Sequence, residues 1–94
     1  MKTITEAKLE KYFTVTKAAI SMVQEKGLDE KRKKEAADCL DMAERYYADA
    51  QHFKKKGDWV TAFAALNYAH GWLDAGARLR LFKVNDSKLF TVDD

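Results

Sequence analysis

Two glycine breaks divide this chain into three long stretches that contain no proline. The breaks are Gly27-Leu28-Asp29 and Gly57-Asp58. Glycine readily adopts the positive φ that ends a helix, and aspartate is a preferred N-cap for the helix that follows. Turn residues are scarce elsewhere, because the 94 residues hold four glycines in all. The sequence therefore predicts three helices, at about 5–26, 30–56 and 59–82.

Apolar residues recur with helical spacing in each stretch. The first two stripes are Leu9, Tyr12, Phe13, Thr16, Ala19, Ile20 and Val23, then Ala36, Cys39, Leu40, Ala43, Tyr46, Tyr47, Ala50 and Phe53. The third stripe covers about half of the helix circumference, which suits a helix packed against two others. Its members are Ala62, Ala65, Leu66, Tyr68, Ala69, Trp72, Leu73, Ala75, Gly76 and Leu79. The predicted connections between helices are two or three residues long, and connections this short force neighbouring helices to run antiparallel. We expect an all-α fold: an up-down-up antiparallel three-helix bundle over residues 1–82. The short C-terminal tail, 83–94, should dock on the bundle or on a partner.

Composition excludes several classes of protein. With 47% hydrophobic and 34% charged residues, the chain has the balance of one soluble domain. No uncharged apolar run approaches the ~20 residues of a membrane span, and the N-terminus lacks the order of a signal peptide. A net charge of +2 does not by itself argue for nucleic acid. We expect a cytoplasmic protein with no membrane contact and no cofactor; nucleic acid is disfavoured but stays open.

Residues 43–75 resemble a single tetratricopeptide hairpin. The matching positions are Tyr46, Ala50, Phe53, Gly57, Asp58, Ala62, Leu66 and Ala69. Asp74 stands where that family usually has proline, and its period of about 34 residues does not recur here. A lone hairpin cannot form the concave groove of a repeat array. The match therefore favours similar hairpin packing, with peptide recognition as the minority interpretation.

Longer runs resemble an archaeal family of small helical proteins, domain-of-unknown-function family 357. They are RYYADA at 45–50, then Phe53 and KGD at 56–58, AHGWLDAGARL at 69–79 and LFTV at 89–92. The resemblance covers roughly residues 36–92. It implies a helical fold and an archaeal, cytoplasmic source, and it carries no catalytic residues over.

Four polar residues of the third stretch form one stripe, within about 80° of arc at helical spacing. They are Asn67, His70, Asp74 and Arg78. The Asp74 carboxylate is spaced to orient and charge the imidazole of His70, which could then act as acid, base or ligand. This would suit a small-ligand or metal protein. The same spacing also describes a solvated face with ordinary helical ion pairs, so we treat the stripe as a candidate binding site.

Arg45 and His52 resemble the Arg-x6-His signature of helical ribonucleases of the higher-eukaryote-and-prokaryote nucleotide-binding class. Both residues project from the same side of the predicted helix, as that chemistry requires. Tyr46 departs from the pattern, because a polar residue commonly follows that arginine and Tyr46 belongs to the apolar stripe. An RNA-binding or RNA-cleaving helical domain is therefore the alternative function.

No metal site is expected, because His52 and His70 would lie about 10 Å apart along the helix axes. Cys39, the single cysteine, excludes an internal disulfide and falls inside the apolar stripe, which predicts a small buried hydrophobe. The basic run KRKK at 31–34 is surrounded by acidic residues, which favours a solvated face. The chain also lacks paired carboxylates, a glycine-rich phosphate loop and a nucleophile motif, so catalysis is disfavoured.

Surplus aromatic residues predict an interaction surface. Trp59, Phe63 and Phe82 fall outside the densest apolar arc of the third helix, and the tail adds an apolar run. The candidate surface is Trp59, Phe63, Trp72, Phe82, Leu89 and Phe90. Exposed aromatic residues of this kind mark protein contacts. We predict a non-enzymatic protein–protein interaction or scaffold module that is a homo-oligomer or binds a helical protein. We expect a dimer at micromolar concentration, with the tail packed on its own bundle or on a second copy.

Overall fold

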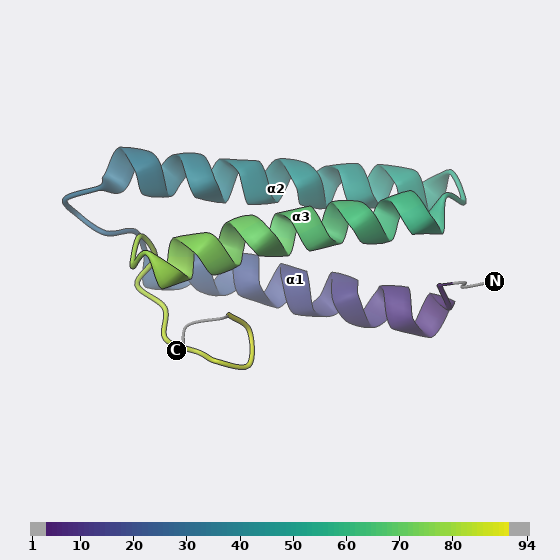
Figure 1. The fold of residues 1–94 in the computed structure, drawn as a ribbon, viewed down its shortest axis with the longest axis horizontal. Helices are drawn as coiled ribbons and strands as arrows, with labels where there is room; N and C mark the ends of the chain where they lie inside the picture. The colour runs from purple at the N-terminus through teal and green to yellow at the C-terminus, as the bar shows by residue number, and fades with distance from the viewer. Residues whose placement is uncertain (1–3, 91–94) are drawn as a thin grey trace.

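Three helices run up, down and up along the long axis of the molecule (Figure 1). They are α1 (Glu6–Lys26), α2 (Lys33–Lys55) and α3 (Trp59–Arg78), in a computed structural model that describes residues 4–90. Helix α3 lies between the other two and packs against both, whereas α1 and α2 touch least. The predicted all-α antiparallel three-helix bundle is confirmed.

Helices α2 and α3 pack through small side chains. On α2, Ala36, Ala43 and Ala50 follow one another at intervals of seven residues, and all three are fully buried. The buried small residues of α3 are Ala62, Ala65, Ala69, Gly76 and Ala77. Because the distance between helix axes depends on the side chains at the contact, alanine lets these two helices approach closely.

Helix α1 supplies larger side chains to two core clusters. Leu9 and Phe13 pack in the cluster that includes Leu66, near the turn between α2 and α3. Ile20 and Val23 pack in a second cluster near the opposite end of the bundle. The stripe predicted for this helix is buried except Tyr12, whose ring packs edge-on against Phe63 at 4.9 Å.

The turn between α2 and α3 follows the sequence pattern closely. Gly57 has a φ of 81°, and the backbone N–H groups of Gly57 and Asp58 donate to the carbonyl oxygens of Lys54 and Phe53. This is the Schellman arrangement that ends many helices. The Asp58 carboxylate then accepts a hydrogen bond from the Thr61 N–H at 3.1 Å, as expected of an N-cap.

The connection between α1 and α2 departs from the prediction. Gly27 has a positive φ of 96°, yet its ψ of 179° is extended rather than left-handed helical. The Asp29 carboxylate accepts from the Arg32 N–H at 3.0 Å, so it closes a turn at 30–32. Helix α2 therefore begins at Lys33 and not at residue 30.

Helix α3 ends at Arg78, four residues before the predicted boundary at 82. Arg80 has a φ of 61°, and the N–H groups of Arg80 and Leu81 donate to the carbonyls of Ala77 and Gly76. This second Schellman motif turns the chain back, so that the ring of Phe82 lies against Gly76. Phe82 also forms an isolated antiparallel bridge with Leu28.

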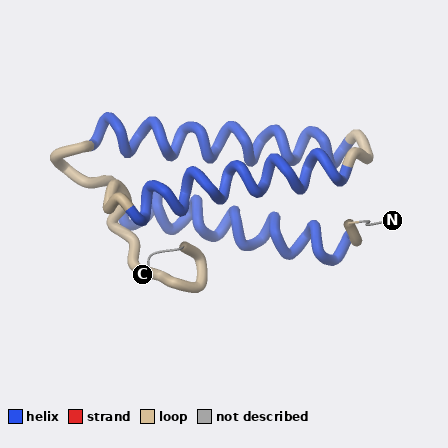
Figure 2. Tube along the Cα trace, in the orientation of Figure 1, coloured by secondary structure: helices blue, strands red, loops and turns tan. Residues whose placement is uncertain are grey.

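Beyond the bridge, the chain curls back under one end of the bundle (Figure 2). The chain turns at residues 87–89, where the Asp86 carboxylate accepts from the Lys88 N–H at 2.8 Å. Phe90 follows with 2% of its surface exposed, in the same core cluster as Leu73 and Phe82. Residues 91 and 92 of the predicted apolar run lie outside the described residues.

Candidate functional site

One face of α3 is apolar although it is exposed. Val60, Tyr68 and Leu79 are 65%, 63% and 59% exposed, and Ala64, Gly71 and Ala75 between them are exposed as well. At 100° per residue these six positions fall within about 100° of arc, roughly opposite the buried side of the helix. Exposed Arg78 lies in the same arc near its C-terminal end, at the angle of Val60. We call these six residues the outward face of α3.

The outward sides of the other helices differ in chemistry. Helix α1 exposes Lys11, Lys17 and Gln24, and α2 exposes Lys34, Asp38 and Arg45, side chains that water solvates well. By contrast, residues 59–73 of α3 include no lysine, arginine, aspartate or glutamate. A helix that is apolar on both sides is normally covered on both sides.

The outward face is hollowed beside Gly71. A shallow depression of about 320 Å³ is lined by Asn67, Tyr68, Gly71, Trp72 and Ala75. A methyl group built on Gly71 would meet no atom within 4 Å, so the floor of this depression is open. The Tyr68 ring forms one wall and stacks on Tyr46 of α2, with ring centres 5.2 Å apart. A second depression along the same face is lined by Asp74, Ala75, Arg78 and Leu79.

The predicted polar stripe is divided between two environments. Asn67 and Arg78 are exposed and line the two depressions on α3. His70 and Asp74 are half-buried beside the tail, with the His70 Nε2 atom 2.8 Å from the Leu89 carbonyl oxygen and 3.6 Å from an Asp74 oxygen. Since both neighbours of Nε2 are acceptors, this nitrogen carries a hydrogen and donates a hydrogen bond to the Leu89 carbonyl oxygen. His70 therefore holds the tail at Leu89.

The predicted aromatic surface is only partly present. Phe82 and Phe90 are 3% and 2% exposed and belong to the core, so neither can form a contact surface. The chain reverses at Arg80, which places Phe82 beyond α3 instead of on its side. Trp72 lines a depression on the outward face. The other predicted surface residues, Trp59, Phe63 and Leu89, are half-buried, as Trp72 is.

Arg45 and His52 lie on α2 but form no joint site. The Arg45 Nε atom donates to an Asp41 oxygen at 2.8 Å. The His52 ring lies edge-on to Phe53, with ring centres 5.5 Å apart. Seven residues of helix separate the two side chains by about 10 Å along the axis. The structure does not bring them into contact.

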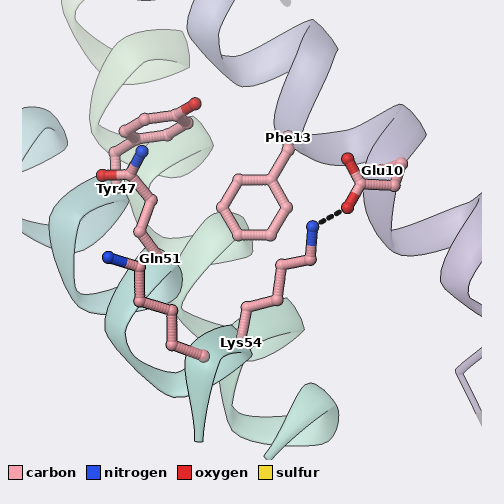
Figure 3. Close-up of a pocket in the computed structure, with 6 residues that line it drawn as sticks. Glu10, Phe13, Tyr47, Gln51 and Lys54 are labelled. Atoms are coloured by element: carbon pink, nitrogen blue, oxygen red, sulfur yellow. Dashed lines mark hydrogen bonds and ion pairs between the residues drawn. The ribbon is translucent and has the colours of Figure 1, made fainter. Parts of the chain in front are cut away.

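A groove between α1 and α2 was not anticipated from the sequence. It is lined by Glu10, Phe13, Tyr47, Gln51, Lys54 and Lys55 (Figure 3). The Lys54 ammonium forms an ion pair with Glu10 and lies 5.5 Å from the centre of the Phe13 ring. Burial raises the pKa of the Tyr47 hydroxyl above its ordinary value. Residues 44 positions apart meet here, and no local pattern in the sequence signals such a contact.

Cys39 is half-buried against the core, less deeply than predicted. Burial, with a smaller contribution from Asp38, raises the pKa of its thiol, so the reactive thiolate is disfavoured. Across residues 4–90, no three side chains of His, Cys, Asp or Glu lie close enough together to hold a metal ion. In the same residues, no helix has the length and apolar character needed to cross a bilayer.

A family model described as protein of unknown function (DUF357) matches residues 11–82. The match includes α1 from residue 11 onward and the whole of α2 and α3. No curated protein and no solved structure matches the chain.

Proposed function

The chain belongs to the DUF357 family, and we propose that it is a non-enzymatic protein–protein interaction module that docks a helix on the outward face of α3. The observation that carries this proposal is the exposure of Val60, Tyr68 and Leu79 on a helix whose opposite side already forms the core. The first fifteen residues of this helix also lack charged side chains.

The shape of this face suits a helix as its partner. Ala64, Gly71 and Ala75 keep the surface low, so a partner backbone could approach closely between the larger side chains. Covering a side chain such as Val60 or Leu79 is worth up to ~1.5–3 kcal/mol, according to how much of it becomes buried. Helices commonly bind through a few such anchors spaced by three or four residues.

Charged and titratable groups at three other candidate sites, the polar stripe, the groove between α1 and α2, and Arg45 on α2, are held by contacts within the chain. His70 donates to the tail, and the Lys54 ammonium pairs with Glu10 across the groove. Arg45 is engaged by Asp41 on its own helix. These contacts engage His70, Lys54 and Arg45 within the chain, which supports the interaction surface over acid–base or RNA-directed chemistry.

Two matched substitutions test the proposal. Ala64→Glu places a charge on the outward face, whereas Ala37→Glu places one on an exposed site of α2 at a similar distance from the helix start. Both variants should keep the helical content and unfolding midpoint of the unchanged protein, because neither alanine is buried. Each tagged chain is expressed in the native host beside an untagged copy of itself and purified after nuclease treatment.

We expect the unchanged chain and Ala37→Glu to recover the same protein, whether the untagged copy or another protein. Ala64→Glu should lose at least nine-tenths of it, because burying a carboxylate in an apolar contact is costly. Equal recovery by all three chains contradicts the proposal. So does recovery of nucleic acid alone when nuclease is omitted.

A further inference from the structure

We propose that the outward face of α3 binds the same face of a second copy, with the two α3 helices antiparallel about a two-fold axis. This rests on the proposed function of that face and adds the identity and direction of the partner helix. The basis is a symmetry in the order of exposed residues.

The outward face has the same spacing in both directions. Its residues, Val60, Ala64, Tyr68, Gly71, Ala75 and Leu79, are separated by four, four, three, four and four positions. A two-fold axis at the middle of this series passes between Ala69 and His70. It places Val60 of one copy opposite Leu79 of the other, Ala64 opposite Ala75, and Tyr68 opposite Gly71. In a two-fold interface each such pairing occurs twice.

The paired residues are also complementary in size. Tyr68 is 63% exposed, and the position opposite it is Gly71, where the surface is hollowed. The alanine pairs on either side let the helix backbones approach, and each outer pair joins two apolar side chains. A parallel arrangement would instead place Tyr68 against Tyr68 and Gly71 against Gly71, which combines a clash with a void.

The charges at the end of α3 favour the same direction. At the C-terminal end of α3, Arg78 lies at the same helical angle as Val60, and Asp74 lies beside the outward face. In a parallel pair each Arg78 would lie beside the Arg78 of the other copy, which would place two like charges next to each other. In the antiparallel pair the symmetry places Arg78 opposite Thr61. The two arginines are then about 25 Å apart along the axis, at 1.5 Å of rise per residue.

Single cysteines can test the direction of the pairing. With Cys39→Ala as the background, Ala64→Cys and Ala75→Cys are made on separate chains, one of them carrying a tag that changes its mass. A disulfide needs Cα atoms about 6 Å apart. In the antiparallel pair residue 64 of one copy faces residue 75 of the other. Two copies of residue 64 lie about 16 Å apart along the axis.

We expect the mixture of the two chains to form a disulfide-linked heterodimer under mild oxidation, while each chain alone stays largely unlinked. If the Ala64→Cys chain alone forms as much disulfide-linked dimer as the mixture, the pair is parallel and the inference is overturned. If both the unchanged protein and the cysteine chains stay monomeric and unlinked over a hundredfold range of concentration, the inference also fails. The proposed function would survive that result if the unchanged chain still captured another protein and Ala64→Glu did not. It would fail if both chains captured that protein equally.

Gly71→Leu provides a second test, in which a loss of dimerisation could not be attributed to unfolding. Leucine favours helix, and a side chain at residue 71 meets nothing within the monomer, so this variant should fold at least as stably as the unchanged protein. It fills the depression opposite Tyr68, so we expect dimerisation measured by light scattering to weaken more than tenfold. A folded Gly71→Leu variant that dimerises as well as the unchanged protein would refute the pairing of Tyr68 with Gly71.

Discussion

Replacing Gly76 by alanine tests how the end of α3 is packed. Gly76 is buried, and the ring of Phe82 occupies the space where a β-carbon would lie. A methyl group there would stand 2.7 Å from the Cδ2 atom of Phe82 and closer still to Cε2 and Cζ. Phe82 is 3% exposed, so its ring cannot move aside without leaving the core or shifting the backbone.

Two opposing effects set the size of the change. Alanine is better than glycine inside a helix by about 1 kcal/mol. Expelling a buried phenylalanine ring costs up to about 3 kcal/mol in lost burial. We therefore expect Gly76→Ala to lower the free energy of unfolding by about 2 kcal/mol. In a Phe82→Ala background the obstacle is gone, so the same change should raise it by about 1 kcal/mol, a coupling of about 3 kcal/mol.

Urea denaturation followed by circular dichroism measures all four members of this cycle. Gly71→Ala is the control in the same helix, because a methyl group there meets no atom within 4 Å and should gain about 1 kcal/mol. The measurements are made at a concentration where light scattering gives the mass of a monomer. If Gly76→Ala is as stabilising as Gly71→Ala, Phe82 does not lie against Gly76, and the described end of α3 is wrong.

Substitutions at Arg80, Asp58 and Phe90 test other parts of the fold. Arg80 has a φ of 61°, so Arg80→Gly should stabilise by about 0.5–1 kcal/mol whereas Arg80→Ala should not; equal thermal midpoints for the two variants would contradict this. Hydrogen bonds from Thr61, first from its side chain and then from its backbone N–H, hold the pKa of Asp58 below its ordinary value. The stabilisation by Asp58 is therefore complete above that ordinary value and is lost as the pH falls through the folded pKa. Asp58→Ala should lower the urea midpoint at neutral pH, with a difference that closes in strongly acidic buffer; a difference that persists there would rule out this origin. Phe90→Ala should cost at least about 3 kcal/mol because the ring is buried; a loss no larger than that for half-buried Leu89→Ala would show that Phe90 is not in the core.

Local sequence determined the number of helices, their order and most of their ends. The helical spacing of Leu9, Phe13, Ile20 and Val23 is a local property, and it places these residues on one buried side whatever the rest of the chain does. Gly57 and Asp58 act in the same way, because a positive φ and an N-cap need only neighbouring residues. These features could be predicted because they depend on contacts within four or five positions.

Tertiary structure decided where α3 ends and what becomes of the chain after it. Arg80 carries no local signal for a left-handed turn, and the helical pattern continues to Phe82. The turn at Arg80 allows Phe82 and then Phe90 to bury their rings in the core, and burying one such ring outweighs the strain of one positive φ. The contact of His70 with Leu89 follows from this reversal.

The candidate site was likewise only partly visible in the sequence. The apolar half-circle predicted for the third helix includes Tyr68, Ala75 and Leu79, which lie on the outward face, together with Leu66 and Leu73, which lie in the core. Periodicity alone shows how wide an apolar surface is. Which part of it meets the other helices depends on how α1 and α2 are placed around α3, and the small residues Ala36, Ala43 and Ala50 settle that for α2 by allowing the closest approach on one side.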